Sequence, residues 1–314
     1  MTITSDTSSL YRIRSLLPTS VANALSRLDK TTLDRISEIR LRKNGVTTLT
    51  IDGKNQILTL CGITREIRNG IICSSSDIED FIYRFCKGSI YSHENTLSDF
   101  FIVNEGIRVG LSGEAVYKNG MISGIGEVQS LCIRLPRHID GCSENLMNHI
   151  KQNGFDNGSG ILIISAPGVG KTTLLRDLTH KLSSDRDMGF LRVCVIDERR
   201  EIYMDKIFSG CCVDFLSGID KIKGLEIACR VLSPQIIICD EISGPDEAER
   251  ITRQKNSGVT FIASFHAESP EDALAKDYIK RMFEERVFSH IFCLSRNERM
   301  VTGTLFDYRD SVND

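Results

Sequence analysis

A short segment near the middle of the chain, SAPGVGKTT at residues 165–173, has residue types and spacing suited to binding phosphate. Gly168 and Gly170 let the backbone approach an anion with no Cβ in the way, so that successive N–H groups can point at it. Lys171 would reach the β- and γ-phosphates of a nucleotide, and the Thr172 hydroxyl would bind Mg²⁺. We therefore expect a phosphate-binding loop for ATP with Mg²⁺. The residues assigned to it are Ser165, Ala166, Pro167, Gly168, Val169, Gly170, Lys171, Thr172 and Thr173.

The segments on either side of this loop support the assignment. Residues 161–164 are apolar and predict a buried parallel strand. Four leucines between residues 174 and 182 predict the apolar stripe of a helix whose N-terminus adds partial positive charge at the loop. Ser165 stands where such loops usually have their first glycine, and serine is small enough to preserve the turn. The alternative is a glycine-containing turn followed by an accidental Lys-Thr, but strand, loop and helix together favour phosphate binding.

A pair of carboxylates, Asp240 and Glu241, follows the apolar segment 236–239. Asp240 would hold Mg²⁺ through a water molecule, and Glu241 would orient or deprotonate the water that attacks the terminal phosphate. Acidic pairs at the end of a strand are common by chance. The phosphate-binding loop in the same region favours the functional interpretation.

A second acidic group, Asp197-Glu198 with Glu201, follows the apolar segment 192–196. These carboxylates could face the γ-phosphate, which makes Glu198 and Glu201 candidate catalytic residues. The alternative is a solvated loop in which two neighbouring arginines neutralise the acids.

A histidine, His266, follows the apolar segment 259–264, which should lie beside the strand that precedes the loop. A histidine at this place can sense the γ-phosphate or a neighbouring subunit, so His266 is a further candidate catalytic residue. The alternative is a histidine with a structural role.

Fast phosphoryl transfer needs cations for the charge that develops on the phosphoryl oxygens. The segment after Glu241 has no convincing arginine finger, because Arg250 and Arg253 lie on a polar helix. Arg108 and Arg134 lie in otherwise apolar strands of the first part of the chain. They could complete the site across a domain or subunit interface, although ordinary surface arginines would look the same.

Alternating strands and helices from residue 161 onward predict how these residues are brought together. Apolar strands separated by helices are typical of a parallel sheet covered on both faces, and ligands bind at the carboxyl ends of its strands. The expected strands are residues 161–164, 192–196, 236–239 and 259–264. The expected helices are residues 171–182, 225–232 and 246–256.

The first part of the chain predicts an α+β domain without a metal or nucleophile motif. Short helices are expected in residues 8–30, and a capping box at residues 76–79 would start a helix that reaches Phe85. Strands are expected at 38–42 and 46–51 around an Asn-Gly turn, and a β-meander at 100–135 with strands at 101–103, 107–111, 114–117 and 131–135. The Gly- and Asn-rich residues 153–160 follow a short helix at 142–151, so we place a smaller N-terminal domain at 1–140 and an α/β domain at 141–314.

Composition describes an ordinary globular protein and excludes several classes. The 314 residues carry a net charge of −3 and are 41% hydrophobic and 26% charged. No apolar run approaches the ~18 residues of a membrane span, and the first residues do not read as a secretory signal. The 11 cysteines form no C-x-x-C pair, which fits free thiols in a reducing cytoplasm.

The order of phosphate-binding loop, acidic group, Asp-Glu pair and His266 resembles the secretion ATPases of type II and type IV systems. The chain more closely resembles the stage III sporulation protein AA family of endospore-forming bacteria. The segments that carry this resemblance are 38–42 (EIRLR), 89–92 (SIYS), 107–115 (IRVGLSGEA), 170–177 (GKTTLLRD), 196–202 (IDERREI) and 233–242 (SPQIIICDEI).

The resemblance implies a RecA-like P-loop ATPase domain and an N-terminal domain that closes over the ATP of a neighbouring subunit. It also implies a cytoplasmic ring, a homo-hexamer, on the mother-cell side of a forespore channel, with membrane channel proteins as partners and no membrane insertion of its own. Arg108 and Arg134 match positions where secretion ATPases have arginines near the nucleotide. The chain departs from the pattern at Arg200, where a serine is expected, and in having Ala267-Glu268 rather than glycine after His266.

Three functions follow from these observations. The first is an ATPase that powers or assembles a channel. The second is a single-stranded nucleic-acid-binding ATPase, against which the charge of −3 and the lack of basic tracts interleaved with aromatics argue. The third is a scaffold that binds ATP as a switch and turns it over slowly, which the departures from the family pattern keep open.

Overall fold

The computed structural model describes residues 8–86, 100–104, 106–136, 139–155, 158–255, 258–297 and 300–308. Contacts between Cα atoms divide the chain into two compact units, residues 3–138 and residues 139–314. This division lies two residues before the boundary that the sequence suggests at residue 140. The segment 89–92, which contributed to the family resemblance, lies outside the described residues.

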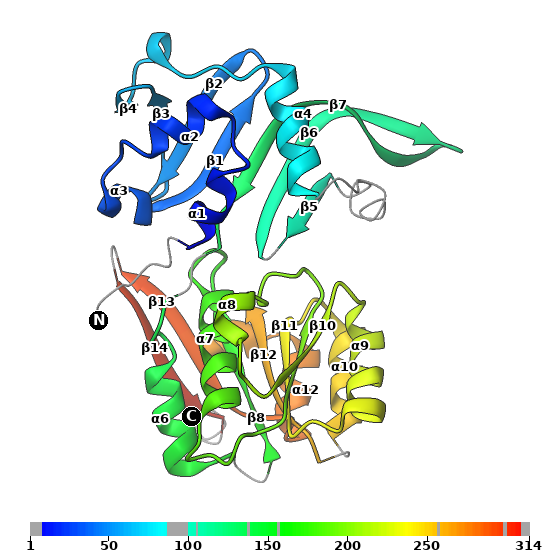
Figure 1. Cartoon of the computed structure of the whole chain (residues 1–314). Helices are drawn as coiled ribbons and strands as arrows, with labels where there is room; N and C mark the ends of the chain where they lie inside the picture. The colour runs from blue at the N-terminus through cyan, green and yellow to red at the C-terminus, as the bar shows by residue number, and fades with distance from the viewer. Residues whose placement is uncertain are drawn as a thin grey trace. The chain divides into compact units, whose positions relative to one another are not determined.

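The N-terminal unit is built on an antiparallel sheet with helices on one face (Figure 1). Its strand order is β4-β3-β2-β1-β7-β6-β5. The strands are β1 (Ile36–Arg42), β2 (Gly45–Ile51), β3 (Lys54–Thr59), β4 (Gly62–Thr64), β5 (Phe101–Asn104), β6 (Ile107–Lys118) and β7 (Met121–Arg134). The helices are α1 (Ser8–Arg14), α2 (Thr19–Leu25), α3 (Lys30–Asp34) and α4 (Ser75–Phe85), with a 3-10 turn at Ile67–Asn69.

Helix α4 shows how local sequence and packing set an element in this unit. Its buried residues Ile78, Phe81, Ile82 and Phe85 recur at helical spacing and pack in the hydrophobic core of the N-terminal unit. The capping box that starts it is formed by Ser74 and Asp77, so the prediction of a box at residues 76–79 was wrong by two residues. Three successive serines make the start ambiguous in the sequence, and the buried face of the helix decides it.

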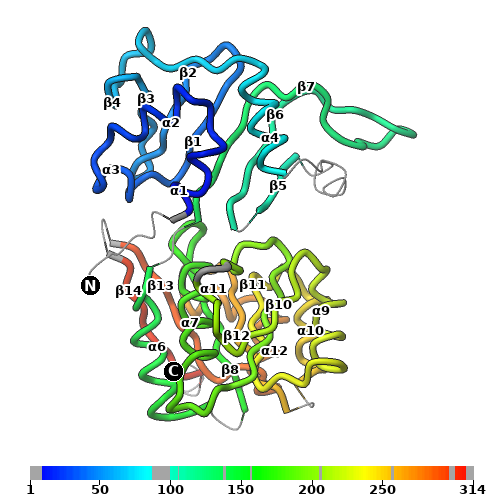
Figure 2. The backbone as a smooth tube through the Cα atoms, viewed as in Figure 1, coloured from blue at the N-terminus to red at the C-terminus, as the bar shows by residue number. Residues whose placement is uncertain are grey.

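Strands β6 and β7 form a long hairpin whose outer half extends away from the core (Figure 2). Asn119 and Gly120 form its turn with positive φ angles of 54° and 78°, as the Asn-Gly pair predicts. The sequence suggested two strands, at 107–111 and 114–117, where the structure has one. Register shifts between Ser112 and Ala115 bend β6 without breaking it.

The C-terminal unit is a sheet of order β10-β9-β11-β12-β8-β13-β14 between two layers of helices (Figure 1). Its strands are β8 (Gly160–Ser165), β9 (Val193–Asp197), β10 (Val213–Ser217), β11 (Ile236–Glu241), β12 (Thr260–His266), β13 (Phe288–Asn297) and β14 (Met300–Asp307). Its helices are α6 (Glu144–Asn153), α7 (Lys171–Ser184), α8 (Asp205–Phe208), α9 (Lys221–Ile227) with a π-turn at Ala228–Leu232, α10 (Pro245–Gln254), α11 (Pro270–Leu274) and α12 (Asp277–Glu284).

Alternate residues of the central strands enter two separate cores. Ile161 and Ile163 of β8 pack with α6 and α7, whereas Leu162 and Ile164 pack in the core that contains α9, α10 and α12. The expectation of an α/β sheet covered on both faces is confirmed. The sheet is mixed rather than wholly parallel, because β14 pairs antiparallel with β13 at one edge.

The sequence interpretation missed the outer strands of this sheet. No strand was expected at β10 or β14, and for β13 only Cys293 was noted as part of an apolar, strand-like run. Strand β10 is only partly buried, so it has no continuous apolar run to mark it. Its place in the sheet depends on parallel pairing with β9, which is a long-range contact.

Candidate active site

The predicted phosphate-binding loop connects β8 to α7 at the carboxyl edge of the sheet. Gly168 and Gly170 have φ angles of +74° and +132°, which L-residues with a Cβ rarely adopt, so this turn requires glycine at both positions. Helix α7 begins at Lys171, so the free N–H groups of its first turn lie at the end of the loop. Pro167 and Gly168 are exposed at the tip, and Ala166, Val169, Thr172 and Thr173 are half-buried. The loop can therefore receive an anion.

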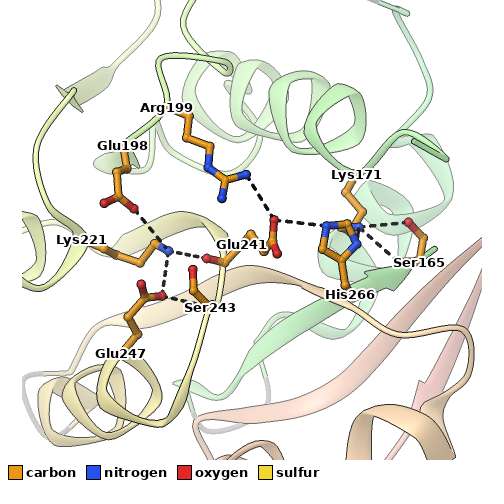
Figure 3. A network of polar contacts seen from close by, with 9 residues as sticks. All are labelled: Ser165, Lys171, Glu198, Arg199, Lys221, Glu241, Ser243, Glu247 and His266. Carbon is orange, nitrogen blue, oxygen red and sulfur yellow. Dashed lines mark hydrogen bonds and ion pairs between the residues drawn. The ribbon is translucent and has the colours of Figure 1, made fainter. Parts of the chain in front are cut away.

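Lys171 is buried beneath the loop and contacts both the loop and the neighbouring strand β12 (Figure 3). Its ammonium donates to the Ser165 carbonyl at 3.2 Å, to the Ser165 hydroxyl at 3.4 Å and to His266 Nδ1 at 2.7 Å. Burial lowers the pKa of Lys171, and the nearby carboxylates Glu241 and Asp240 oppose that shift. The two acids predicted from the sequence are thus close to the predicted phosphate-binding lysine.

His266 joins Lys171 to Glu241. An ammonium has no acceptor, so His266 Nδ1 accepts from Lys171, and His266 Nε2 lies 3.2 Å from Glu241 Oε2. Arg199 Nη1 lies 3.5 Å from the same carboxylate oxygen. The carboxylate of Glu241 is therefore held between an imidazole and a guanidinium, as Figure 3 shows.

A β-bulge brings Asp240 and Glu241 to the same site. The register between β11 and β12 shifts by one residue after Cys239, so that Glu241 pairs with Ser264 and Asp240 is an additional residue. In a regular strand two successive side chains point to opposite faces, but a bulge re-aims one of them. Both carboxylates act on the charge of Lys171 as a result.

Asp240 is nearly buried at the end of β11. Burial, with the charges of Glu201 and Asp197 nearby, raises the pKa of Asp240 to about 6. A cation bound beside it would remove this penalty, because it favours the ionised carboxylate.

The oxygen atoms near Asp240 suit Mg²⁺. The hydroxyl of Ser264 is fully buried in β12, on the sheet face that packs against α7, and has no hydrogen-bond partner among the described residues. Mg²⁺ prefers oxygen ligands and keeps several waters, which such a hydroxyl and carboxylate can hold. Thr172 lies in the first turn of α7, as predicted for an Mg²⁺ ligand. The described residues contain no cluster of three or more His, Cys, Asp or Glu that could hold a metal by side chains alone.

The acidic group after β9 divides into structural and exposed members. Asp197 is fully buried, and its carboxylate accepts the backbone N–H groups of Glu201, Ile202 and Tyr203 at 2.8, 3.1 and 3.0 Å. It therefore orders the following turn rather than facing a ligand. Arg200, at the position where we expected a serine, adopts a positive φ of 55° within this turn.

Glu201 and Glu198 occupy different surroundings. The carbonyl of Glu201 accepts a hydrogen bond from Arg176, and its carboxylate is close enough to raise the pKa of Asp240. Glu198 Oε2 lies 3.9 Å from Lys221 Nζ, in a group of contacts that the sequence interpretation did not identify.

Arg108 and Arg134 belong to the N-terminal unit, where they face each other across β6 and β7. The guanidinium of Arg108 lies over the ring of Phe101, 4.1 Å from its centroid. Arg134 Nε is 3.8 Å from Glu38 Oε2 on the neighbouring strand β1. They are thus neighbours within one sheet, and their predicted role at the nucleotide stays a prediction.

Other features agree with the composition. None of the helices in the described part of the chain has the length and apolar character needed to cross a bilayer. All the described cysteines are free thiols, and burial raises the pKa of Cys142, Cys194 and Cys239 to about 12.

Comparisons with known proteins show the family of the chain. Residues 9–311 match the family described as "Sporulation stage III, protein AA". The chain is 31% identical over 300 residues to stage III sporulation protein AA of Bacillus subtilis (strain 168), and the match covers 91% of each protein.

Solved structures show the same fold at low sequence identity. A crystal structure of the Legionella pneumophila ATPase DotB matches with a TM-score of 0.60 at 14% identity, covering 88% of this chain and 78% of that one. The pilus retraction motor PilT with bound ADP matches with a TM-score of 0.59 at 12% identity, covering 88% and 81%. The chain therefore has the fold of these P-loop ATPases, preceded by an N-terminal unit.

Proposed function

The chain belongs to the family of sporulation stage III protein AA, and from this premise we propose that it binds ATP with Mg²⁺ and hydrolyses it. The observation that carries the proposal is the line of contacts from Lys171 through His266 to Glu241, with 2.7 Å from Lys171 Nζ to His266 Nδ1 and 3.2 Å from His266 Nε2 to Glu241 Oε2. It joins the lysine that would bind phosphate to the carboxylate that would act on water. A structural role alone would not require this pair to lie beside a loop built for an anion.

The residues of the site divide the work of hydrolysis. The loop residues 165–170 and the first N–H groups of α7 would bind the phosphates, with Lys171 at the β- and γ-phosphates. Glu241 would orient the attacking water and take its proton. Mg²⁺ bound beside Asp240 and Thr172 would neutralise phosphate charge.

Binding of ATP would change the state of Glu241. Once Lys171 turns to phosphate, His266 loses the donor at Nδ1 and is free to rotate. Glu241 Oε2 then exchanges its present partners, His266 and Arg199, for a water beside the γ-phosphate. Glu198 and Glu201 would act as secondary acids near this water.

We also propose that the active form is a ring. Charge on the phosphoryl oxygens needs further cations, and Arg108 and Arg134 of the N-terminal unit would supply them to the ATP of an adjacent subunit. The family suggests a homo-hexamer in the mother-cell cytoplasm, which powers or assembles a channel to the forespore together with membrane proteins. These assignments rest on the family relationship.

A second function, an ATP-dependent scaffold with slow turnover, is favoured by one observation. The carboxylate of Glu241 already contacts Arg199 and His266, and these contacts must break before it can hold a water beside the γ-phosphate. One experiment separates the two. Purified protein is titrated with a fluorescent ATP analogue with Mg²⁺, and phosphate release is measured on the same sample across protein concentrations. Tight ATP binding with steady turnover that rises as rings form supports the ATPase. Binding with less than one turnover per subunit supports the scaffold. No ATP binding refutes both functions.

A further inference from the structure

A buried lysine lies behind the proposed catalytic carboxylate. Lys221 is the first residue of α9, and only 3% of its side chain is exposed. Burying an ammonium without partners costs several kcal/mol, so hydrogen-bond acceptors and opposite charges must compensate for the hydration that it loses. Lys221 Nζ donates to the Glu241 carbonyl, contacts Glu247 Oε2 at 2.8 Å and lies 3.9 Å from Glu198 Oε2. Three segments far apart in the sequence thus meet at one charge (Figure 3).

The carbonyl that Lys221 holds lies past the end of the pairing between β9 and β11. On the β9 side, pairing with β11 ends at Ile196 and Cys239, two residues before Glu241. On the β12 side the ladder resumes after the bulge at Asp240, where Glu241 pairs with Ser264 and the Ile242 N–H donates to the Ser264 carbonyl at 2.8 Å. The ammonium of Lys221 therefore serves as the donor that β9 no longer provides, and together with the Ile242–Ser264 bond it holds the peptide plane that follows Glu241.

Glu247 completes a clamp on the same turn. Its Oε2 accepts from Lys221 and from the backbone N–H of Ser243 at 3.0 Å. The ammonium and this carboxylate together hold residues 241–243 at both ends. Because Cα and Cβ of Glu241 follow from its peptide planes, the clamp also fixes the direction in which the Glu241 side chain leaves the strand.

We propose that Lys221 is a positioning residue for hydrolysis. Its ammonium holds the backbone carbonyl of Glu241. The side-chain carboxylate of Glu241 is thereby directed at the attacking water. Stability alone does not explain an ionic clamp here, since apolar residues of similar volume commonly replace buried ion pairs without loss. The inference rests on the proposed role of Glu241 and adds the residue that orients it.

The test compares variants that keep the lysine stem. Lys221→Met removes the charge, and the double variant with Glu247→Gln avoids leaving a half-buried carboxylate unpaired. Lys223→Met is the matched control, because Lys223 lies two residues further along α9, is exposed and pairs only with Glu226 among the contacts we describe. Binding of a fluorescent ATP analogue, kcat and KM for ATP, and thermal denaturation are measured for each.

We expect kcat to fall about ten- to hundredfold in Lys221→Met, with KM and ATP affinity within about twofold, because a small misplacement of a catalytic group has an effect of this size. The double variant should regain thermal stability without regaining kcat, and the control should match the parent protein. An unchanged kcat in folded Lys221→Met, a change in KM alone, or recovery of kcat together with stability in the double variant would each overturn the proposal.

Hydrogen exchange keeps this inference distinct from the proposed function. In nucleotide-free protein, amide exchange of residues 241–247 should accelerate in Lys221→Met and stay unchanged in Lys223→Met. If the parent protein binds ATP without hydrolysing it, the proposed function fails and exchange alone decides: local acceleration supports the clamp, and unchanged exchange of this segment overturns it.

Discussion

Two groups of charged residues in this protein are built in contrasting ways. At the carboxyl edge of the C-terminal sheet, Lys171, His266 and Glu241 come from α7, β12 and β11 and contact one another within 3.2 Å. On the N-terminal sheet, Arg108 and Arg134 stand on adjacent strands, and the Arg134 side chain is 64% exposed with its ion-pair partner 3.8 Å away.

The comparison shows which charged side chains are held in one geometry and which are exposed and able to change partners. Contacts that link distant elements hold the first group in one arrangement before any ligand binds, with Lys171 buried and His266 and Glu241 partly exposed. An exposed ion pair such as Arg134–Glu38 contributes only about 0–1 kcal/mol and can exchange its partner easily. The first group is suited to binding and chemistry within one unit, and the second to meeting a charge that comes from elsewhere.

The strongest test of the first group is Lys171→Ala. We expect ATP affinity to fall about a hundredfold or more and turnover to be lost, because several charge-assisted hydrogen bonds to phosphate disappear. Titration with a fluorescent ATP analogue measures the affinity. Lys181→Met on the same helix is the control, since Lys181 contacts Glu144 on α6. Normal affinity in a folded Lys171→Ala protein would refute the phosphate-binding loop.

The strongest test of the second group is Arg108→Ala. If this arginine serves a neighbour's nucleotide, turnover should fall about 10³-fold while ATP affinity changes little. Phosphate release is the measurement.

Mixing Arg108→Ala with Lys171→Ala then asks where Arg108 acts. In mixed rings some interfaces pair an intact loop with an intact Arg108, so partial activity should return. Demonstrated mixed assembly without recovery, or full activity in a confirmed monomer, would exclude action between subunits.

Glu241→Gln tests whether the carboxylate at the bulge is the base. The amide keeps the shape and cannot accept the proton, so hydrolysis should fall about 10²- to 10³-fold with ATP still bound. Single-turnover phosphate release is the measurement, and Glu201→Gln is the matched control. Turnover like that of the parent protein would transfer the role to Glu198 or Glu201.

Asp240→Asn tests the electrostatic cost of burying the Asp240 carboxylate beside the first group. The pKa of Asp240 is raised from 3.8 to about 6 by burial, so the folded state holds a proton that the unfolded state releases between these values. Stability is therefore lost as pH rises from about 4 to 6, and the full penalty, roughly 2–3 kcal/mol, applies above that range. In chelator, the variant should melt higher at pH 7.5 and like the parent below pH 4. An equal gain at both pH values would contradict the assigned cause.

Arg134→Ala should have the smallest effect on stability. Its exposed ion pair predicts a change of less than about 1 kcal/mol in the free energy of unfolding, measured by denaturant titration. Turnover should fall nonetheless if the residue reaches a nucleotide. A large loss of stability would mean that the two groups of charges are not as different as their contacts indicate.

Prediction from the sequence was most accurate where local pattern decides structure. The glycines of the loop, the leucine stripe of α7 and the apolar strands β8, β9, β11 and β12 were all recognisable, because each follows from residue type and periodicity over a few positions. The capping of α4 was misplaced for the opposite reason, since three adjacent serines give several local solutions.

Two residues of the site had no recognisable signal. In the sequence, Lys221 looks like any lysine near a helix start. Its contacts with the turn after β9, with β11 and with α10 appear only in the tertiary structure. Ser264 lies in an apolar strand, and only burial of its hydroxyl without a partner among the described residues marks it.

By itself, the sequence determined the strands β8, β9, β11 and β12, the helices α7 and α10, and the chemistry available at the ends of these strands. Only the tertiary structure decided that β14 closes the sheet antiparallel, that Asp197 orders a turn rather than facing a ligand, and that a bulge turns Asp240 and Glu241 toward one site. The reason is physical. Periodicity reports which face of an element is buried, whereas the contact of Lys171 with His266 joins residues 95 positions apart and depends on the pairing of β8 with β12.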